Sequence, residues 1–85
     1  MNVISRRRYL IPLQNGDTLN VLVEEQGNPS LYKYAAVDTG WDERCKFSTG
    51  NTIEDAVNEL ADLIDVTLPH DWRNYESGLR AVAAA

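Results

Sequence analysis

One apolar stripe in residues 50–65 constrains the fold of this chain more than any other feature. Thr52 is a typical N-cap residue, and Asp55 three positions later stands where a capping box has its acidic member. The stretch GNTIEDAVNELADLID therefore predicts an amphipathic helix that packs on a sheet. Its apolar side chains recur at the i, i+3, i+4, i+7, i+8 and i+11 positions of one helix face, namely Ile53, Ala56, Val57, Leu60, Ala61 and Ile64.

The first half of the chain alternates in the manner of strands, and QNGD at 14–17 is a strong hairpin signal. A two-residue loop would place apolar side chains beside polar ones on the paired strands. A three-residue loop, with Gly16 in the left-handed conformation of a bulge, avoids this mismatch, so we predict the longer loop. Its register puts six apolar side chains on one face: Tyr9, Ile11, Leu13, Leu19, Val21 and Val23.

Two more strands are expected before the helix. One lies near Leu31 to Asp38, and its facing stays open, because either Tyr32, Tyr34 and Ala36 or Leu31, Ala35 and Val37 can point to the core. The other is a short strand from Arg44 to Ser48, which we expect to bury Cys45 and Phe47.

After the helix, Pro69 can start a second short helix. The predicted fold class is α+β: an antiparallel meander of three to four strands packed against one amphipathic helix, with a short C-terminal second helix. The 85 residues, of which 44% are hydrophobic, suit one small domain over 1–85. The second helix would carry an apolar stripe of Trp72, Tyr75, Leu79 and Val82.

The chemistry available to the chain is limited. Cys45 and His70 are its only cysteine and histidine, so a disulfide within the chain, a cysteine-rich zinc site and a two-histidine metal site are excluded. No nucleophile motif surrounds Cys45, and no assembled set of acid, base and nucleophile is evident. We therefore expect neither an enzyme nor a cofactor. The unpaired cysteine and the lack of a signal peptide or membrane span fit a cytoplasmic protein.

The net charge of −5 is distributed unevenly. Residues 1–50 hold six basic and six acidic side chains, whereas residues 51–85 hold seven acidic ones against Arg73 and Arg80. The basic run Arg6, Arg7 and Arg8 does not form one patch, because a strand sends Arg7 to the opposite side from its neighbours. Direct binding of nucleic acid is therefore not expected, since it needs a dominant basic surface. A protein partner with a basic surface fits the charge better.

The predicted helix carries acidic side chains and no basic ones. Asp62 and Asp65 lie toward its C-terminal end, where the helix dipole disfavours negative charge, so stability alone would not select them. The acidic side is either an ordinary solvated face or a binding surface. Trp41 and Trp72 are either interface anchors or core residues. The candidate partner-binding residues are therefore Glu54, Asp55, Glu59, Asp62, Asp65, Trp41 and Trp72.

The stretch CKFSTGNTIEDAVNELADLI resembles the HicB-like antitoxin family, a partial RNase-H-like fold of three strands and a helix without a catalytic centre. In that family a cysteine-containing strand leads through Gly-Asp-Thr into a helix beginning Glu-Glu-Ala. The resemblance covers about Leu19 to Pro69, and it implies a toxin-neutralising protein that has lost its operator-binding function. The residues in similar places are Cys45, Gly50, Asn51, Thr52, Glu54, Asp55 and Ala56.

The chain is also similar in size, charge and lack of chemistry to small acidic phage proteins that inhibit host defence, such as anti-CRISPR proteins. Both resemblances imply a non-enzymatic inhibitor whose acidic helix face blocks a basic nucleic-acid-binding surface of its partner. The alternative is a structural or homo-oligomeric module, such as a homodimer, that associates through the C-terminal stripe of Trp72, Tyr75, Leu79 and Val82.

Overall fold

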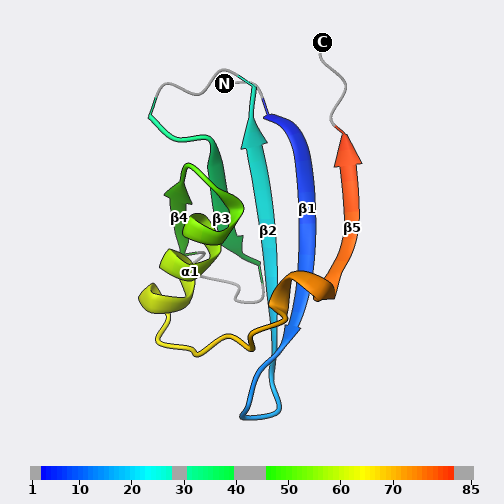
Figure 1. Cartoon of the computed structure of the whole chain (residues 1–85), viewed down its shortest axis with the longest axis vertical. Coiled ribbons are helices and arrows are strands. Elements are labelled where there is room, and N and C mark those ends of the chain that lie inside the picture. The colour runs from blue at the N-terminus through cyan, green and yellow to red at the C-terminus, as the bar shows by residue number, and fades with distance from the viewer. Residues whose placement is uncertain (1–2, 28–30, 40–45, 82–85) are drawn as a thin grey trace.

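Five antiparallel strands form one sheet, and a single α-helix lies over one side of it (Figure 1). The computed structural model describes residues 3–27, 31–39 and 46–81, the last three of these by their backbone alone. In these residues the strand order is β4-β3-β2-β1-β5. The elements are β1 (Val3–Pro12), β2 (Thr18–Gln26), β3 (Tyr34–Asp38), β4 (Phe47–Gly50), α1 (Ile53–Leu63), the 3-10 turn η1 (Trp72–Tyr75) and β5 (Glu76–Ala81).

The β1–β2 hairpin has the predicted loop and register. Gly16 has a φ of 90°, and its amide donates to the Leu13 carbonyl at 3.1 Å. The Leu13 amide donates to the Asp17 carbonyl at 2.8 Å, which closes a three-residue loop. Tyr9 stands opposite Val21 and Ile11 opposite Leu19, so the apolar side chains of both strands share one face. The choice of loop from the hydrophobic pattern is confirmed.

The start of α1 is held by its cap and by a close approach to β4. The Thr52 hydroxyl accepts the Asp55 amide at 3.0 Å, as predicted. A Cβ on Gly50 would lie 2.7 Å from the Ala56 nitrogen, so only glycine fits between strand and helix. The buried Ser48 hydroxyl donates to the Ala56 carbonyl. These contacts fix the position of the first helical turn on the sheet.

The core lies between α1 and the inner face of the sheet. The predicted helix stripe is buried from Ile53 to Ala61, and Ile64 packs against it from just beyond the helix. Tyr34 and Ala36 face this core while Leu31 is 88% exposed, which settles the facing of the third strand. The sheet contributes Tyr9, Ile11, Leu19, Val21, Val23 and Ala36, all buried.

The expectation for the fourth strand is wrong in its facing. β4 runs from Phe47 to Gly50, so it continues past the expected end at Ser48, and Arg44 lies outside the described residues. Phe47 is 62% exposed while Ser48 is 6% exposed. A shift of one residue exchanges the two faces of a strand. Here the close approach at Gly50 directs Ser48 toward α1 and turns Phe47 away. Cys45, which was expected to be buried on this strand, lies outside the described residues.

The predicted C-terminal helix is also wrong. Trp72–Tyr75 form one 3-10 turn, and Glu76–Ala81 form β5, which pairs antiparallel with β1. The helical spacing of Trp72, Tyr75 and Leu79 is therefore not the face of a helix. The unpaired side of β1 offers backbone donors and acceptors that a strand satisfies, whereas Gly78 weakens a helix. The meander of four strands is confirmed, and β5 extends it on the far side of β1.

Candidate functional site

The outer side of α1 carries four acidic side chains, which we call the acidic face: Asp55, Glu59, Asp62 and Asp65. The first three follow one line along the helix at i, i+4 and i+7, and Asp65 stands just beyond the last turn. All four residues are exposed. Within residues 3–27, 31–39 and 46–81, none of the four carboxylates has an ion pair or a side-chain hydrogen bond. The face therefore presents negative charge that these parts of the chain do not neutralise.

The C-terminal end of α1 is built around Asp65. Its φ of 58° is in the left-handed region, where glycine is the usual residue. The Val66 amide donates to the Ala61 carbonyl at 3.0 Å, and the Asp65 amide donates to the Asp62 carbonyl at 3.3 Å, which together form a Schellman motif. No basic residue stands in the last turn. An aspartate here therefore has an unfavourable backbone conformation as well as an unfavourable position in the helix dipole.

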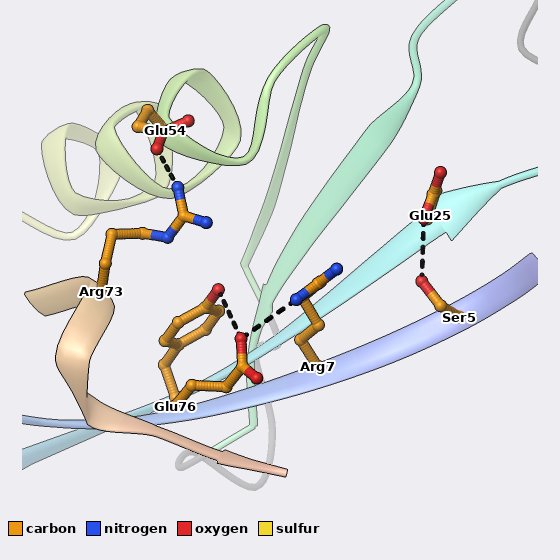
Figure 2. Close-up of polar contacts among 7 residues, drawn as sticks. Ser5, Arg7, Glu25, Glu54, Arg73 and Glu76 are labelled. Carbon is orange, nitrogen blue, oxygen red and sulfur yellow. Dashed lines mark hydrogen bonds and ion pairs between the residues drawn. The ribbon is translucent and has the colours of Figure 1, made fainter. Parts of the chain in front are cut away.

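Glu54 differs from the acidic face although it lies on the same helix. Figure 2 shows Arg73, from η1, reaching across to the Glu54 carboxylate, with which it forms an ion pair. The Arg73 guanidinium also lies over the Trp72 ring, 5.6 Å from its centroid. Of the five predicted helix acids, Glu54 is the one that forms an ion pair with another described residue, although its side chain is also exposed.

A second acidic group, Glu76 at the start of β5, is also partnered within the fold. Its Oε1 accepts Nη1 of Arg7 and the hydroxyl of Tyr9, each at 3.2 Å, and Figure 2 shows Arg7 directed at Glu76. Burial raises the pKa of Tyr9 above its ordinary value, since the phenolate would be poorly solvated; Arg73 opposes this effect and Glu76 adds to it. The neutral hydroxyl therefore remains a donor to Glu76 and ties β5 to β1.

The two tryptophans proposed as interface anchors have different outcomes. Trp72 is 6% exposed and meets the Tyr9 ring edge to face, with 5.4 Å between ring centroids. It therefore closes the core, as the structural alternative expects, and offers little surface. Trp41 lies outside the described residues.

A groove that the sequence did not indicate runs along the C-terminal half of α1. It is open to solvent, has a volume of about 480 Å³ and separates the helix from residues 66–72. Its apolar lining, which we call the wall, includes Val66 and Leu68, with Trp72 almost fully buried beneath. Its polar lining, which we call the rim, comprises Asn58, Asp62, Thr67 and His70. The groove arises because the VTLPHDW segment turns back along the helix instead of continuing it. Asp62 thus belongs both to the acidic face and to this groove.

The face of the sheet opposite α1 has a different character. Strand alternation places Arg6 and Arg8 on it, while Arg7 points to the helix side, as predicted. Nε of Arg6 forms an ion pair with Glu24 at 2.8 Å, and Arg8 donates to Asn20. Cross-strand pairing aligns Phe47, Val37 and Leu22 with Arg8 in one row across four strands. This face therefore carries apolar and basic side chains, and the acidic side chain of Glu24 already forms an ion pair with Arg6.

The remaining sequence candidates are His70 and Cys45. His70 is exposed on the groove, whereas Cys45 lies outside the described residues. Across the described ranges, no three residues among His, Cys, Asp and Glu are grouped so that they could hold a metal ion. In the same ranges, no helix is long and apolar enough to cross a membrane.

Comparison with protein-family models, curated protein sequences and solved structures gives no match for this chain. The resemblances to the HicB-like antitoxins and to anti-CRISPR proteins therefore stay predictions.

Proposed function

We propose that this chain is a non-enzymatic protein-binding inhibitor, antitoxin-like or anti-CRISPR-like, whose acidic face occupies the basic nucleic-acid-binding surface of a partner protein. The observation that carries the proposal is the set of four outer carboxylates without a described internal counter-charge. An acidic surface can occupy a surface that binds phosphates, because carboxylates and phosphates both present negative charge to the same arginines and lysines.

The design of α1 supports this proposal. Neighbouring acids at i, i+3 and i+4 repel by a few tenths of a kcal/mol each, and Asp65 adds an unfavourable backbone conformation. The helix tolerates these unfavourable contributions to its stability because its other side is buried and its N-terminus is capped. A rigid helix presents its carboxylates in fixed positions, which lowers the entropic cost of binding.

The experiment compares partner capture by the wild type with capture by the double variant Asp55→Lys/Glu59→Lys. A control, Asp17→Lys, reverses an exposed acid in the β1–β2 loop, and it is compared with the single variant Glu59→Lys, which changes the net charge equally. We expect the wild type and Asp17→Lys to capture a nucleic-acid-binding protein and to prevent it from binding nucleic acid. Capture should fall in Glu59→Lys and be lost in Asp55→Lys/Glu59→Lys, which should still fold, as circular dichroism would show. Capture should also weaken as salt is raised.

Two results would contradict the proposal. The first is undiminished capture by the Asp55→Lys/Glu59→Lys variant. The second is a captured partner that binds its nucleic acid and this chain at the same time, because the two would then not share a surface.

A homo-oligomeric module is the second candidate function, and a specific observation favours it. The predicted C-terminal stripe does not form a helix face, but Phe47 and Leu10 on the open sheet face are 62% and 40% exposed. Two such faces can pack sheet on sheet. Sedimentation over a range of concentrations tests this candidate, with Phe47→Ser expected to shift an oligomer toward monomer. A wild type that stays monomeric at high concentration rules it out.

A further inference from the structure

The groove beside α1 differs from the rest of the acidic face because it combines a carboxylate with an apolar wall. Asp62 is the one carboxylate among the lining residues, and no described basic side chain pairs with it. Val66 and Leu68, which are partly buried, supply most of the apolar wall, because Trp72 is almost fully buried in the core. An apolar side chain alone would bury the wall but leave Asp62 poorly solvated and unpaired, which is unfavourable. A negatively charged group would be repelled.

We propose that this groove binds an arginine side chain of the partner protein, with the guanidinium on Asp62 and the aliphatic stem on the apolar wall. The inference rests on the proposed function, and it names the type of partner side chain that binds the acidic face at Asp62. Arginine fits the groove in two respects. Its stem buries readily on apolar surface while the charged head stays polar. Its planar fork pairs with a carboxylate through two parallel hydrogen bonds.

Lysine matches the groove less well than arginine. Its ammonium is a compact, strongly hydrated charge that makes no bidentate pair with Asp62 and does not lie flat against the wall. The guanidinium has five donors, so after pairing with Asp62 it retains donors for the side-chain oxygens of Asn58 and Thr67 on the same rim. A guanidinium therefore satisfies more of the polar rim than an ammonium does.

The chain already holds an arginine in a similar arrangement one helical segment away. Glu54, Asn58 and Asp62 follow one line along α1 at i, i+4 and i+8. At the first of these positions Arg73 forms an ion pair with Glu54 and lies over the Trp72 ring. At the last position Asp62 offers the same chemistry, again near Trp72, with no described arginine in place. The Arg73–Glu54 pair is therefore a precedent, within this chain, for an arginine beside a carboxylate of α1.

The test is a titration of the isotope-labelled full chain with N-acetyl-arginine N-methylamide, followed by NMR. The citrulline analogue, which keeps the shape of the side chain and lacks its charge, is added at the same concentration and ionic strength. We expect saturable shifts for the amides of Asn58, Asp62 and Thr67 and for the Trp72 indole with the arginine probe, and none with citrulline. Asp62→Asn should lower the association constant roughly five- to tenfold, whereas Asp17→Asn, at an exposed acid outside the acidic face and the groove, should leave it unchanged.

The inference is overturned if the arginine probe shifts only Asp55 and Glu59, if citrulline shifts the groove equally, or if Asp62→Asn binds as the wild type does. It is also overturned if the lysine analogue binds the groove more tightly than arginine. None of these results removes the proposed function, whose test is partner capture by the Asp55→Lys/Glu59→Lys variant. Loss of the proposed function would instead appear as capture unaffected by those reversals, whatever the probe does.

Discussion

Two sets of acidic side chains in this protein differ in whether the chain itself provides a partner. The internal set comprises Glu24, Glu25, Glu54 and Glu76, whose carboxylates meet Arg6, Ser5, Arg73 and Arg7, respectively. The acidic face comprises Asp55, Glu59, Asp62 and Asp65, which have no such partner in the described residues. All members of the internal set tie together elements that are distant in the sequence, whereas the acidic face ties nothing together. The acidic side chains therefore divide into those that contact another part of the fold and those that have no partner in the described residues.

The difference matters because the fold does not need the acidic face. Exposed charges without partners contribute little to stability, and neighbouring like charges on a helix reduce it slightly. Removing a member of the internal set should destabilise the protein, and removing a member of the acidic face should leave stability unchanged or increase it. Four substitutions test this division, beginning with the largest expected change.

Trp72→Ala should have the largest effect, because Trp72 positions the turn that carries Arg73 and leads to Glu76. The side chain is buried against Tyr9, and its loss should lower the free energy of unfolding by about 3–5 kcal/mol. Chemical denaturation measures the change. Trp72→Phe is the matched control, since it keeps an aromatic ring in the core. A loss below 1 kcal/mol would show that the internal set does not depend on Trp72.

Glu76→Ala should have the second largest effect. It removes the acceptor shared by Nη1 of Arg7 and the Tyr9 hydroxyl, both of which are then left without that partner beside β5. We expect the free energy of unfolding to fall by about 1–2 kcal/mol, in the range for an unsatisfied polar group that keeps some access to water. Glu59→Ala, on the acidic face, is the matched control and should change stability by no more than about 0.5 kcal/mol. Equal losses in the two variants would remove the distinction between the sets.

The hairpin and α1 were predictable from the sequence because each is determined by neighbouring residues. Gly16 supplies the positive φ that the loop needs, and alternation selects the register of β1 and β2. Thr52 caps a helix whose apolar spacing is unambiguous. The acidic face followed from the same helix, so its residues were identified before their surroundings were known. Local pattern sufficed for these elements.

The other elements depend on contacts between distant parts of the chain. β5 forms because the edge of β1 is open to it, and nothing within Glu76–Ala81 itself indicates a strand. Phe47 points outward because Gly50 must approach α1 closely, a contact that alternation along β4 alone does not reveal. The pairing of Glu54 with Arg73 and the groove at Asp62 follow from the return of residues 66–72 along the helix. Spacing in the sequence carries no signal for them.

Asp65→Gly should increase stability, as expected for a member of the acidic face and not of the internal set. Glycine adopts the φ of 58° without strain, and the change also removes a negative charge from the C-terminal end of α1. We expect a gain of about 1 kcal/mol in the free energy of unfolding, which thermal and chemical denaturation can measure. Asp65→Asn keeps a residue that tolerates this conformation and removes only the charge, so it should give about half of the gain. A destabilised Asp65→Gly variant would mean that Asp65 belongs with the internal set.

Glu59→Lys is expected to have the smallest effect on stability and the most informative one. The substitution replaces repulsion of Glu59 with Asp55 and Asp62 by attraction at the same i, i+4 and i, i+3 spacings, each worth about 0.2–0.5 kcal/mol. Stability should therefore rise by about 0.5 kcal/mol at low salt and by less at high salt, where such pairs are screened. Partner capture should fall in the same variant, because the acidic face loses its central charge. A protein that becomes more stable and binds less shows that Glu59 is retained for its partner, whereas unchanged capture with higher stability would make this side of α1 an ordinary solvated surface.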